Sequence, residues 1–246
     1  MPEKQNPEHV MHGRMPPSSG AFHENNNWDY NAEPFDYQRD PSWRIFRIMA
    51  EFVDGFNFIT KFPKSVTFFG SARFTEKDEH YRSAQKLARL LARAGYAVIT
   101  GGGPGIMEGA NKGAVEGGGE SVGLNIMLPF EQRINPWVRK AVAFNYFFTR
   151  KVMLAFSASA FVFFPGGYGT LDEAFEILTL RQTHKINPRI PIIMMGHDFW
   201  DPLSDWLKNN AMKKHGTIDE NEFKLFTIVD QPEEAMEIIK KTKLNK

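Results

Sequence analysis

Hydrophobic and polar positions follow a repeating pattern from residue 63 to the end of the chain. Short apolar runs predict strands near residues 65–69, 96–100, 121–126, 141–144, 160–164, 191–195 and 226–229. Segments of helical spacing between them predict helices near residues 76–94, 105–117, 146–157, 171–183, 199–213 and 231–243. Nearly continuous apolar strands that alternate with helices are typical of a parallel sheet covered on both faces. We therefore expect a single α/β domain with a doubly wound, Rossmann-like parallel sheet.

Two local signals mark helix ends in this pattern. Gly95 follows the helix near residues 76–94, at the position where a glycine commonly ends a helix. Asp230 and Glu233 have the spacing of a capping box and predict the start of the last helix.

The N-terminal part differs in composition from the rest. Residues 1–41 contain six prolines and seven acidic against three basic residues, a composition that cannot bury enough apolar surface to order itself. We expect a flexible tail there, an amphipathic helix over residues 42–62 and the α/β domain over residues 63–246. The helix must dock on the domain or on a second subunit, because large apolar residues recur along it at helical spacing: Trp43, Phe46, Met49, Val53 and Phe56.

The composition excludes several classes of partner and site. Thirty basic and 29 acidic residues give a net charge of +1, so no overall field favours nucleic acid or an anionic membrane. The absence of cysteine excludes disulfides, thiolate nucleophiles and cysteine-bound metals, and the seven histidines are scattered. We expect a cytoplasmic protein with no metal and no cofactor, whose partners include neither nucleic acid nor membrane.

Glycine-rich loops follow three of the predicted strands, in the stretches FFGSARF, VITGGGPGIMEGAN and FVFFPGGYGTLDE. At a strand-to-helix turn, backbone N–H groups and the helix N-terminus converge on an anion, and glycine lets the backbone approach it. Because the carboxyl ends of parallel strands share one edge of the sheet, we expect these loops to bind one phosphate-bearing ligand. Its candidate contacts are Gly70, Ser71, Gly102, Gly103, Gly105, Gly166, Gly167, Tyr168, Gly169 and Thr170.

Motifs that the loops lack narrow the identity of that ligand. The dinucleotide fingerprint G-x-G-x-x-G is broken at Ile106 in one register and at Glu108 in the other, and no P-loop occurs. A mononucleotide is the ligand that remains. The pattern G-x-S-x-G at residues 119–123 is not expected to hold a hydrolase nucleophile, because Ser121 opens a strand and does not follow one.

Charged residues near the third loop could carry out chemistry. Arg150 and Lys151 lie in the helix after the fourth strand, and Glu173 lies in the first turns after the third glycine loop. If the fourth and fifth strands are neighbours, both positions face the same crevice, and a guanidinium and a carboxylate flank the ligand. From chemistry alone, the alternative that Arg150 and Glu173 form a solvated pair at helix ends stays open.

The stretches GGGPGIMEGANKGA, TRK and PGGYGTLDE resemble the Lonely Guy (LOG) family of cytokinin riboside 5′-monophosphate phosphoribohydrolases, which are often labelled lysine decarboxylases. The resemblance covers roughly residues 63–210. Arg150 and Lys151 match the end of the family's M-x-x-R-K, in which Phe147 replaces the methionine. The family's PGGxGTxxE motif is matched by Pro165, Gly166, Gly167, Gly169, Thr170 and Glu173.

The resemblance implies cofactor-free hydrolysis of the N-glycosidic bond of nucleoside 5′-monophosphates, AMP or N6-modified AMP, with Arg150 and Glu173 as catalytic residues. It implies that Lys151 and the glycine loops hold the phosphate. Glu131 would correspond to the family's substrate-binding glutamate, and Thr179 would face the ligand. It also implies dimers or larger assemblies. This agrees with the surplus of apolar residues in NYFFTRKVMLAF, and we expect a homodimer whose crevice lies near the subunit boundary.

Other interpretations predict different behaviour. A non-catalytic nucleotide sensor on the same fold would bind AMP without releasing adenine. A nicotinamide-dependent oxidoreductase is disfavoured by the broken fingerprint. A decarboxylase would need a lysine that forms an imine with pyridoxal phosphate and a site for the pyridine ring of that cofactor. Lys151, next to a glycine loop, could be that lysine, but no second feature supports this interpretation.

Overall fold

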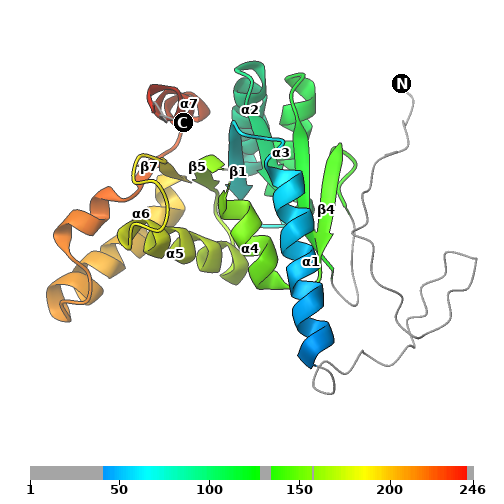
Figure 1. Cartoon of the computed structure of the whole chain (residues 1–246). Helices are drawn as coiled ribbons and strands as arrows, with labels where there is room; N and C mark the ends of the chain where they lie inside the picture. Colours follow the sequence, from blue (N-terminus) through cyan, green and yellow to red (C-terminus); the bar gives the residue numbers. More distant parts are fainter. Residues whose placement is uncertain (1–40, 128–133, 157, 243–246) are drawn as a thin grey trace, which may run out of the picture.

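The computed structural model describes residues 41–127, 134–156 and 158–242 (Figure 1). Its strands are β1 (Ser65–Phe69), β2 (Ala97–Thr100), β3 (Ser121–Ile126), β4 (Lys140–Phe144), β5 (Ala158–Phe163), β6 (Ile192–Met195) and β7 (Thr227–Val229). Its longer helices are α1 (Pro41–Ile59), α2 (Glu79–Arg93), α3 (Ile106–Glu116), α4 (Phe147–Phe156), α5 (Tyr168–Gln182), α6 (His197–Trp206) and α7 (Pro232–Lys241). A π-helical turn, η1 (Leu207–Lys214), and a 3₁₀ helix, η2 (Glu220–Lys224), lie between α6 and β7.

The seven strands form one parallel sheet in the order β4-β3-β2-β1-β5-β6-β7. The chain steps outward from β1 to β4 on one side, crosses back to β5, and steps outward to β7 on the other side. The carboxyl ends of β1 and β5 are therefore the switch point, where open α/β sheets bind their ligands. The predicted doubly wound α/β fold is confirmed.

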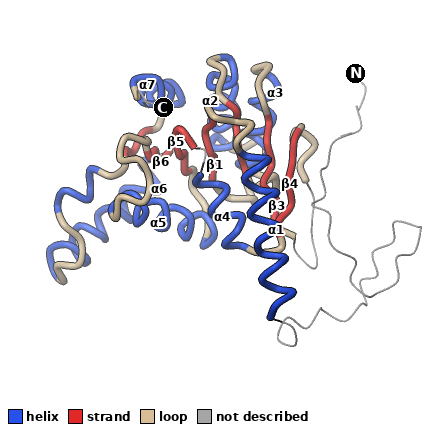
Figure 2. The backbone as a smooth tube through the Cα atoms, in the orientation of Figure 1, coloured by secondary structure: helices blue, strands red, loops and turns tan. Residues whose placement is uncertain are grey.

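Helices cover both faces of the sheet, as the near-continuous apolar strands predict (Figure 2). One buried cluster joins the sheet to α1, α4, α5 and α6, and a second joins it to α2, α3 and α7. Ile99 and Phe161 lie in the first cluster, whereas Val98 and Val162 lie in the second. Successive side chains of a strand point to opposite faces, so both faces of a doubly covered strand must be apolar.

Helix α1 docks on α4 and on the edge strand β4. Its C-terminal part is buried, with Phe58 and Ile59 in the core, and each fully buried side chain of this size stabilises the fold by about 1.5–3 kcal/mol. Gly55 makes the close approach possible, because a Cβ there would lie 2.9 Å from Met153 and 3.1 Å from Phe144. The expected docking of an N-terminal helix on the α/β domain is thus observed, whereas the division of the chain at residues 41 and 62 stays a prediction.

The structure differs from the sequence-based expectation in three places. The helix expected near residues 199–213 is α6 followed by the π-helical η1. The capping box of α7 is formed by Gln231 and Glu234, and the Asp230 carboxylate accepts the backbone N–H of His197 at 2.9 Å. The fourth and fifth strands are not neighbours, since β4 is the edge strand beside β3 and β5 lies between β1 and β6. The expected end of α2 is correct: the helix stops at Arg93, and Gly95 has a φ of 79°.

Among the described residues, no helix combines the length and the apolar character that crossing a membrane requires.

Candidate functional site at the sheet switch point

The three glycine loops meet at the carboxyl edge of the sheet and are joined by backbone hydrogen bonds. The Ser71 N–H in the loop after β1 donates to the Pro165 carbonyl in the loop after β5 at 3.0 Å. The Ser71 carbonyl accepts the N–H of Ile106, the first residue of α3, also at 3.0 Å. One loop therefore fixes the other two, and the starts of α3 and α5 lie on either side of Ser71.

Protein atoms explain part of the glycine content of these loops. Gly105 has a φ of 71°, and a Cβ there would lie 2.2 Å from the Ser71 carbonyl oxygen, so no other residue fits. An added Cβ would also lie within 3.0 Å of protein atoms at Gly70, Gly102, Gly103 and Gly166. Gly167 and Gly169 are different, because no atom lies within 4 Å of an added Cβ at either position. These two glycines face open space, so internal packing does not explain them.

The start of α5 offers free backbone donors beside that open space. Gly167 is the N-cap residue and supplies no side-chain hydrogen bond to the helix, so the first N–H groups of α5 lack the partner that a capping side chain would give. Thr170 is buried in the first turn, whereas the Tyr168 side chain is 93% exposed. The arrangement combines an anion-binding helix start with an exposed aromatic ring.

Arg150 of α4 and Glu173 of α5 form an ion pair next to this helix start. Arg150 Nη2 lies 3.6 Å from Glu173 Oε1, and the two side chains are 15% and 9% exposed. The Arg150 guanidinium also lies against the loop after β2, since a Cβ added to Gly101 would be 3.3 Å from Nη1. The two residues meet although β4 and β5 are not adjacent, because α4 belongs to the crossover that returns the chain from the sheet edge to β5. Glu173 is buried and Arg150 is largely so, which differs from the solvated pair of the alternative interpretation.

Burial dominates the electrostatics of this pair. It raises the pKa of Glu173 to about 7, against the opposing effects of the Arg150 and Lys151 charges. Burial likewise lowers the pKa of Arg150, which the Glu173 and Asp172 carboxylates oppose. The Arg150 Nε–H is buried and has no hydrogen-bond acceptor in the described part of the chain. The site thus holds a carboxyl group that titrates near neutral pH and a guanidinium with an unused donor.

Three further candidate residues lie in different surroundings. Lys151 Nζ is bound by Asp172 at 2.8 Å and Glu176 at 2.7 Å, both on α5. Burial lowers the pKa of Lys151, but the two carboxylates more than offset this, so its pKa is raised. Thr179 is exposed and donates to the Phe175 carbonyl of its own helix, and nothing in the structure brings it to the pair. Glu131 lies outside the described residues.

The structure adds Glu51, which the sequence reasoning missed. Its carboxylate, on α1, accepts the Asn145 N–H at 2.7 Å, the Asn145 side-chain amide at 2.8 Å and the Thr149 hydroxyl at 2.6 Å. Glu51 therefore binds the residues just before α4 and the Thr149 side chain in its first turn, and its negative charge lies at the helix N-terminus, where it interacts favourably with the helix dipole. Its position on α1, far from α4 in sequence, gave no local signal.

A second missed feature is a buried amide network under the loop after β2. The side-chain amide of Asn135 donates to the carbonyls of Gly102 and Gly103 at 3.1 and 2.9 Å and to Asn111 Oδ1 at 3.0 Å. Thr100 donates to the same Asn111 oxygen at 2.7 Å. These hydrogen bonds fix the path of the loop, because the Asn135 amide satisfies the buried carbonyls of Gly102 and Gly103.

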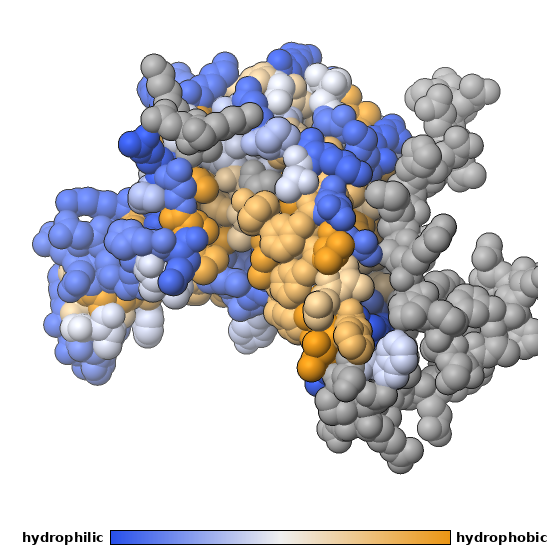
Figure 3. Space-filling model, viewed as in Figure 1, coloured by the Kyte–Doolittle hydropathy of each residue, from blue (hydrophilic) through white to orange (hydrophobic). Residues whose placement is uncertain are grey.

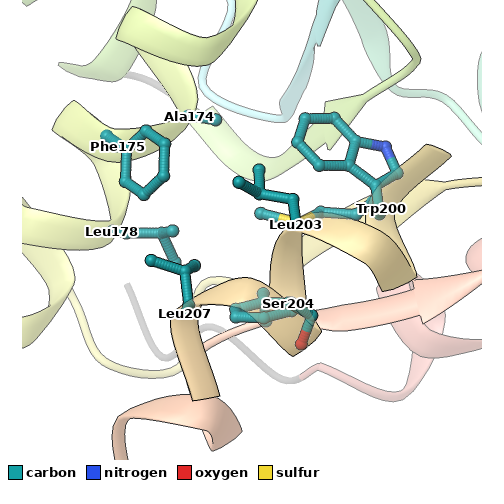
Figure 4. A pocket seen from close by; sticks show the side chains of 9 residues that line it. Ala174, Phe175, Leu178, Trp200, Leu203, Ser204 and Leu207 are labelled. Carbon is teal, nitrogen blue, oxygen red and sulfur yellow. The ribbon is translucent and has the colours of Figure 1, made fainter. Parts of the chain in front are cut away.

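An apolar hollow lies between α5 and α6 (Figure 4), apart from the ion pair that α4 and α5 form. Ser204 is the one polar residue of its lining, and no charged side chain takes part. Such a hollow can hold apolar atoms but offers no acid or base. It is lined by Ala174, Phe175, Leu178, Met194, Trp200, Leu203, Ser204, Leu207 and Phe226.

Known proteins resemble this chain over the region that carries the candidate site. The model of a family described as "Possible lysine decarboxylase" matches residues 107–239, which include both Arg150 and Glu173. A cytokinin riboside 5′-monophosphate phosphoribohydrolase of Rhodococcoides fascians is 25% identical over 154 residues, or 61% of this chain and 77% of that protein. The cytokinin riboside 5′-monophosphate phosphoribohydrolase LOG of Oryza sativa subsp. japonica is 30% identical over 154 residues, or 60% of this chain and 61% of that protein.

Solved structures share the fold. The molybdenum cofactor binding protein from the phototrophic bacterium Rippkaea orientalis has a TM-score of 0.54 and 24% identity, and the match covers 72% of this chain and 96% of that one. At this level of identity the likeness shows a common α/β architecture and does not identify a ligand.

Proposed function

The chain belongs to the possible lysine decarboxylase family, the LOG family, and from this premise we propose that it hydrolyses the N-glycosidic bond of nucleoside 5′-monophosphates. The substrates are AMP or N6-modified AMP, and the products are the free base and ribose 5-phosphate. The observation that carries the proposal is the buried Arg150–Glu173 pair beside the uncapped start of α5. The names of the relatives from Rhodococcoides fascians and Oryza sativa support the reaction type.

Glu173 supplies the negative charge that the reaction needs. Breaking the bond between C1′ and the base leaves positive charge on the ribose, as in other glycoside hydrolyses. An ionised Glu173 stabilises that charge and accepts a proton from the attacking water, whose oxygen bonds to C1′ as the bond to the base breaks. The departing base takes up a proton from solvent, and Glu173 afterwards releases its proton to solvent. With its pKa raised to about 7 by burial, Glu173 is matched to general-base work near neutral pH.

Arg150, the second member of the ion pair, binds and orients the substrate in this proposal. A guanidinium stays protonated in proteins, and its unused, buried Nε–H is available to an oxygen or nitrogen of the substrate. Arg150 therefore orients the nucleotide and stabilises the phosphate charge or the departing base. In the absence of substrate it also holds Glu173 by attraction at 3.6 Å.

The phosphate binds at the start of α5 in this proposal. The open space beside Gly167 and Gly169 lets an anion reach the first N–H groups of the helix. Tyr168 is exposed at the same turn, where its ring can stack on the base or sugar. Binding energy from the phosphate then positions the sugar over Glu173. We assign Lys151 to holding α4 against α5, because both of its ion pairs are to α5.

The decarboxylase activity in the family's description is not the one we propose. An imine with pyridoxal phosphate needs an unprotonated lysine nucleophile, which enzymes obtain by lowering the pKa of the amine. Asp172 and Glu176 instead raise the pKa of Lys151. Lys151 is therefore poorly suited to imine formation.

Incubating the protein with 5′-monophosphates of adenine, N6-modified adenine, guanine and pyrimidines, and separating the products by chromatography, tests the proposal. We expect release of adenine or N6-modified adenine, faster from AMP than from adenosine, because the phosphate supplies binding energy. Saturable AMP binding without free base would support the nucleotide sensor, and equal rates on AMP and adenosine would contradict the phosphate site. The predicted cytoplasmic location and the homodimer stay predictions.

A further inference from the structure

Two helices start at the candidate site without a capping side chain, and they differ in charge. Gly105 precedes α3 and Gly167 precedes α5, and neither gives its helix a side-chain hydrogen bond. The first turn of α3 carries Glu108, whereas the first turn of α5 carries no acidic residue. A carboxylate at a helix start repels a second anion, so the phosphate is better held at α5. The loop after β2, which leads into α3, is left to a neutral part of the nucleotide.

The peptide group between Gly102 and Gly103 in this loop has its orientation fixed by Asn135. The Asn135 N–H donates to the Gly102 carbonyl at 2.9 Å, and the Asn135 side-chain amide donates to the same oxygen at 3.1 Å. In a trans peptide the N–H points opposite to the C=O, so the Gly103 N–H points away from Asn135. Asn135 is buried and Gly103 is partly exposed, and within the described part of the chain no acceptor takes the Gly103 N–H. The loop therefore presents a free backbone donor on its outer side.

The Asn135 side chain is held in one orientation. Its oxygen accepts the Trp137 N–H at 3.1 Å, and its nitrogen also donates to the Gly103 carbonyl at 2.9 Å and to Asn111 Oδ1 at 3.0 Å. Exchanging the two ends of the amide would set donor against donor, or acceptor against acceptor, at each backbone contact. The Gly103 N–H is thus aimed before a ligand arrives, and a donor held in this way loses little entropy on binding.

Arg150 lies between this loop and α5. A Cβ added to Gly101 would be 3.3 Å from Arg150 Nη1, and Arg150 Nη2 lies 3.6 Å from Glu173 Oε1. The guanidinium therefore lies against the loop after β2 on one side and against α5 on the other. A nucleotide with its phosphate at the start of α5 and its sugar over Glu173 places its base beside Arg150, toward the loop after β2.

The surroundings of that loop suit an aromatic ring. Met107 lies along it, because a Cβ added to Gly101 would be 3.0 Å from the Met107 sulfur and one added to Gly103 would be 2.8 Å from the Met107 methyl group. The centre of the Phe147 ring lies 5.5 Å from the guanidinium carbon of Arg150, and the exposed surface of α1 and α4 is largely apolar (Figure 3). Thioether and aromatic groups favour contact with a purine ring over contact with a phosphate.

We propose that the loop after β2 is the subsite for the purine base, and that the Gly103 N–H donates a hydrogen bond to a ring nitrogen of that base. Met107 packs against the ring, and Asn135 is a positioning residue that aims the Gly103 N–H. The inference rests on the proposed function and deepens it, because it assigns the base to one glycine loop and the phosphate to another. A neutral hydrogen bond of this kind changes affinity roughly three- to tenfold.

Calorimetry with AMP and with its 1-deaza, 3-deaza and 7-deaza analogues, each of which replaces one ring nitrogen by carbon, tests the inference. The protein carries Glu173→Gln, so that the ligand is not consumed. We expect one analogue to bind roughly three- to tenfold more weakly than AMP. The difference should vanish in a protein that also carries Asn135→Asp, because the new carboxylate repels the two loop carbonyls and turns the peptide group.

Ser121→Ala, in the same background, is the matched control. Ser121 belongs to the same buried network, where its hydroxyl accepts from Asn111 at 2.9 Å and donates to the Trp137 carbonyl at 2.8 Å, and neither bond involves the loop after β2. This variant should unfold at a lower temperature and keep the ratio of AMP to analogue affinity. Equal affinities for all four ligands, a difference that persists with Asn135→Asp, or a ratio lost equally in Ser121→Ala would overturn the inference. The proposed hydrolysis, which base release measures, would then still stand, whereas failure to bind AMP at all would overturn both.

Nuclear magnetic resonance keeps the inference testable if Asn135→Asp does not fold. In protein labelled with nitrogen-15 glycine, in the same inactive background, the Gly103 amide signal is identified by its loss in Gly103→Ala, whose Cβ meets the flexible end of Met107. AMP should move this signal. Ribose 5-phosphate, which lacks the base, should move the signals of Gly167 and Gly169 and leave that of Gly103 in place. A Gly103 signal that AMP leaves unmoved, or that ribose 5-phosphate moves as far as AMP does, would contradict a base subsite in this loop.

Discussion

The hydroxyl of Thr149 on α4 donates to the Glu51 carboxylate on α1 at 2.6 Å, one residue before Arg150. The same carboxylate accepts the N–H and the side-chain amide of Asn145. Helix α1 lies outside the region that matches the family, residues 107–239. A segment outside that region therefore fixes the start of the helix that brings Arg150 to Glu173.

Replacing Glu51 by alanine should destabilise the protein and impair the site together. Hydrogen bonds to a charged group contribute about 1.5–3 kcal/mol, and their loss leaves donors at the start of α4 without a partner. We expect the free energy of unfolding to fall by roughly 2–3 kcal/mol and kcat/KM to fall more than for Glu51→Gln, which keeps an acceptor. Urea denaturation and base-release assays measure both effects. Equal values for wild type and Glu51→Ala would show that α1 does not position α4.

Glu173→Gln should keep nucleotide binding while turnover collapses. The amide preserves the shape of the side chain but can neither carry negative charge nor accept a proton, and general-base assistance is worth ~10²–10⁴ in rate. Calorimetry with AMP should show a dissociation constant within a few-fold of the wild-type value. Chromatography should show the rate of base release reduced by ~10²–10⁴. Full activity in this variant would remove Glu173 from the mechanism.

The pH dependence of stability should also depend on Glu173. Its pKa is about 7 in the folded protein and near 4.5 in the unfolded chain, so the folded state favours the protonated form. The stability that this group contributes is fully present below about pH 4.5 and is lost as the pH rises through about 7. Glu173→Gln has no group that loses stability in this way. The free energy of unfolding of the variant minus that of the wild type should therefore increase between pH 5 and pH 8, by at most roughly 3 kcal/mol. Unfolding curves at the two pH values measure it, and a constant difference would contradict the shifted pKa.

Arg150→Ala should weaken both nucleotide binding and turnover, and Arg150→Lys should restore part of the binding. Removing the guanidinium also takes away the attraction that lowers the pKa of Glu173. The acid limb of the kcat/KM profile should therefore move to higher pH in Arg150→Ala. A profile and a rate like those of the wild type would show that the ion pair is structural and that Arg150 does not touch substrate.

Two glycine substitutions should separate packing from ligand binding. Gly105→Ala forces a Cβ to 2.2 Å from the Ser71 carbonyl oxygen at a φ of 71°, and we expect it to destabilise the fold by roughly 2–4 kcal/mol. Gly169→Ala has open space around the new methyl group, so its melting temperature should stay near that of the wild type while its affinity for AMP falls. Unchanged AMP affinity in a folded Gly169→Ala protein would place the phosphate elsewhere.

The elements of this fold could be predicted from the sequence because their causes are local. Strands buried on both faces must be apolar throughout, as in SVTFF of β1 and AVIT of β2, and helices between them must be amphipathic. Parallel strands carry their carboxyl ends at one edge, so the order of residues along the chain is enough to assign the glycine-rich stretches and Glu173 to one region. The expected route of Arg150 to that region was wrong, because it required β4 and β5 to be neighbours. The end of α2 at Gly95 also follows from a local conformational preference.

Other features were decided by tertiary structure, because they depend on contacts between segments far apart in the chain. Strand β4 lies at the sheet edge because it pairs with β3 on one side and with no strand on the other. The residues of β4 do not by themselves specify this pairing. Glu51 and Thr149 are 98 residues apart, and Asn135 reaches Gly102 across 33. The glycines of the three loops look alike in sequence, yet Gly105 is explained by the backbone of Ser71 and Gly169 faces open space. Burial also raised the pKa of Glu173, since the dielectric around a carboxylate depends on everything that packs against it.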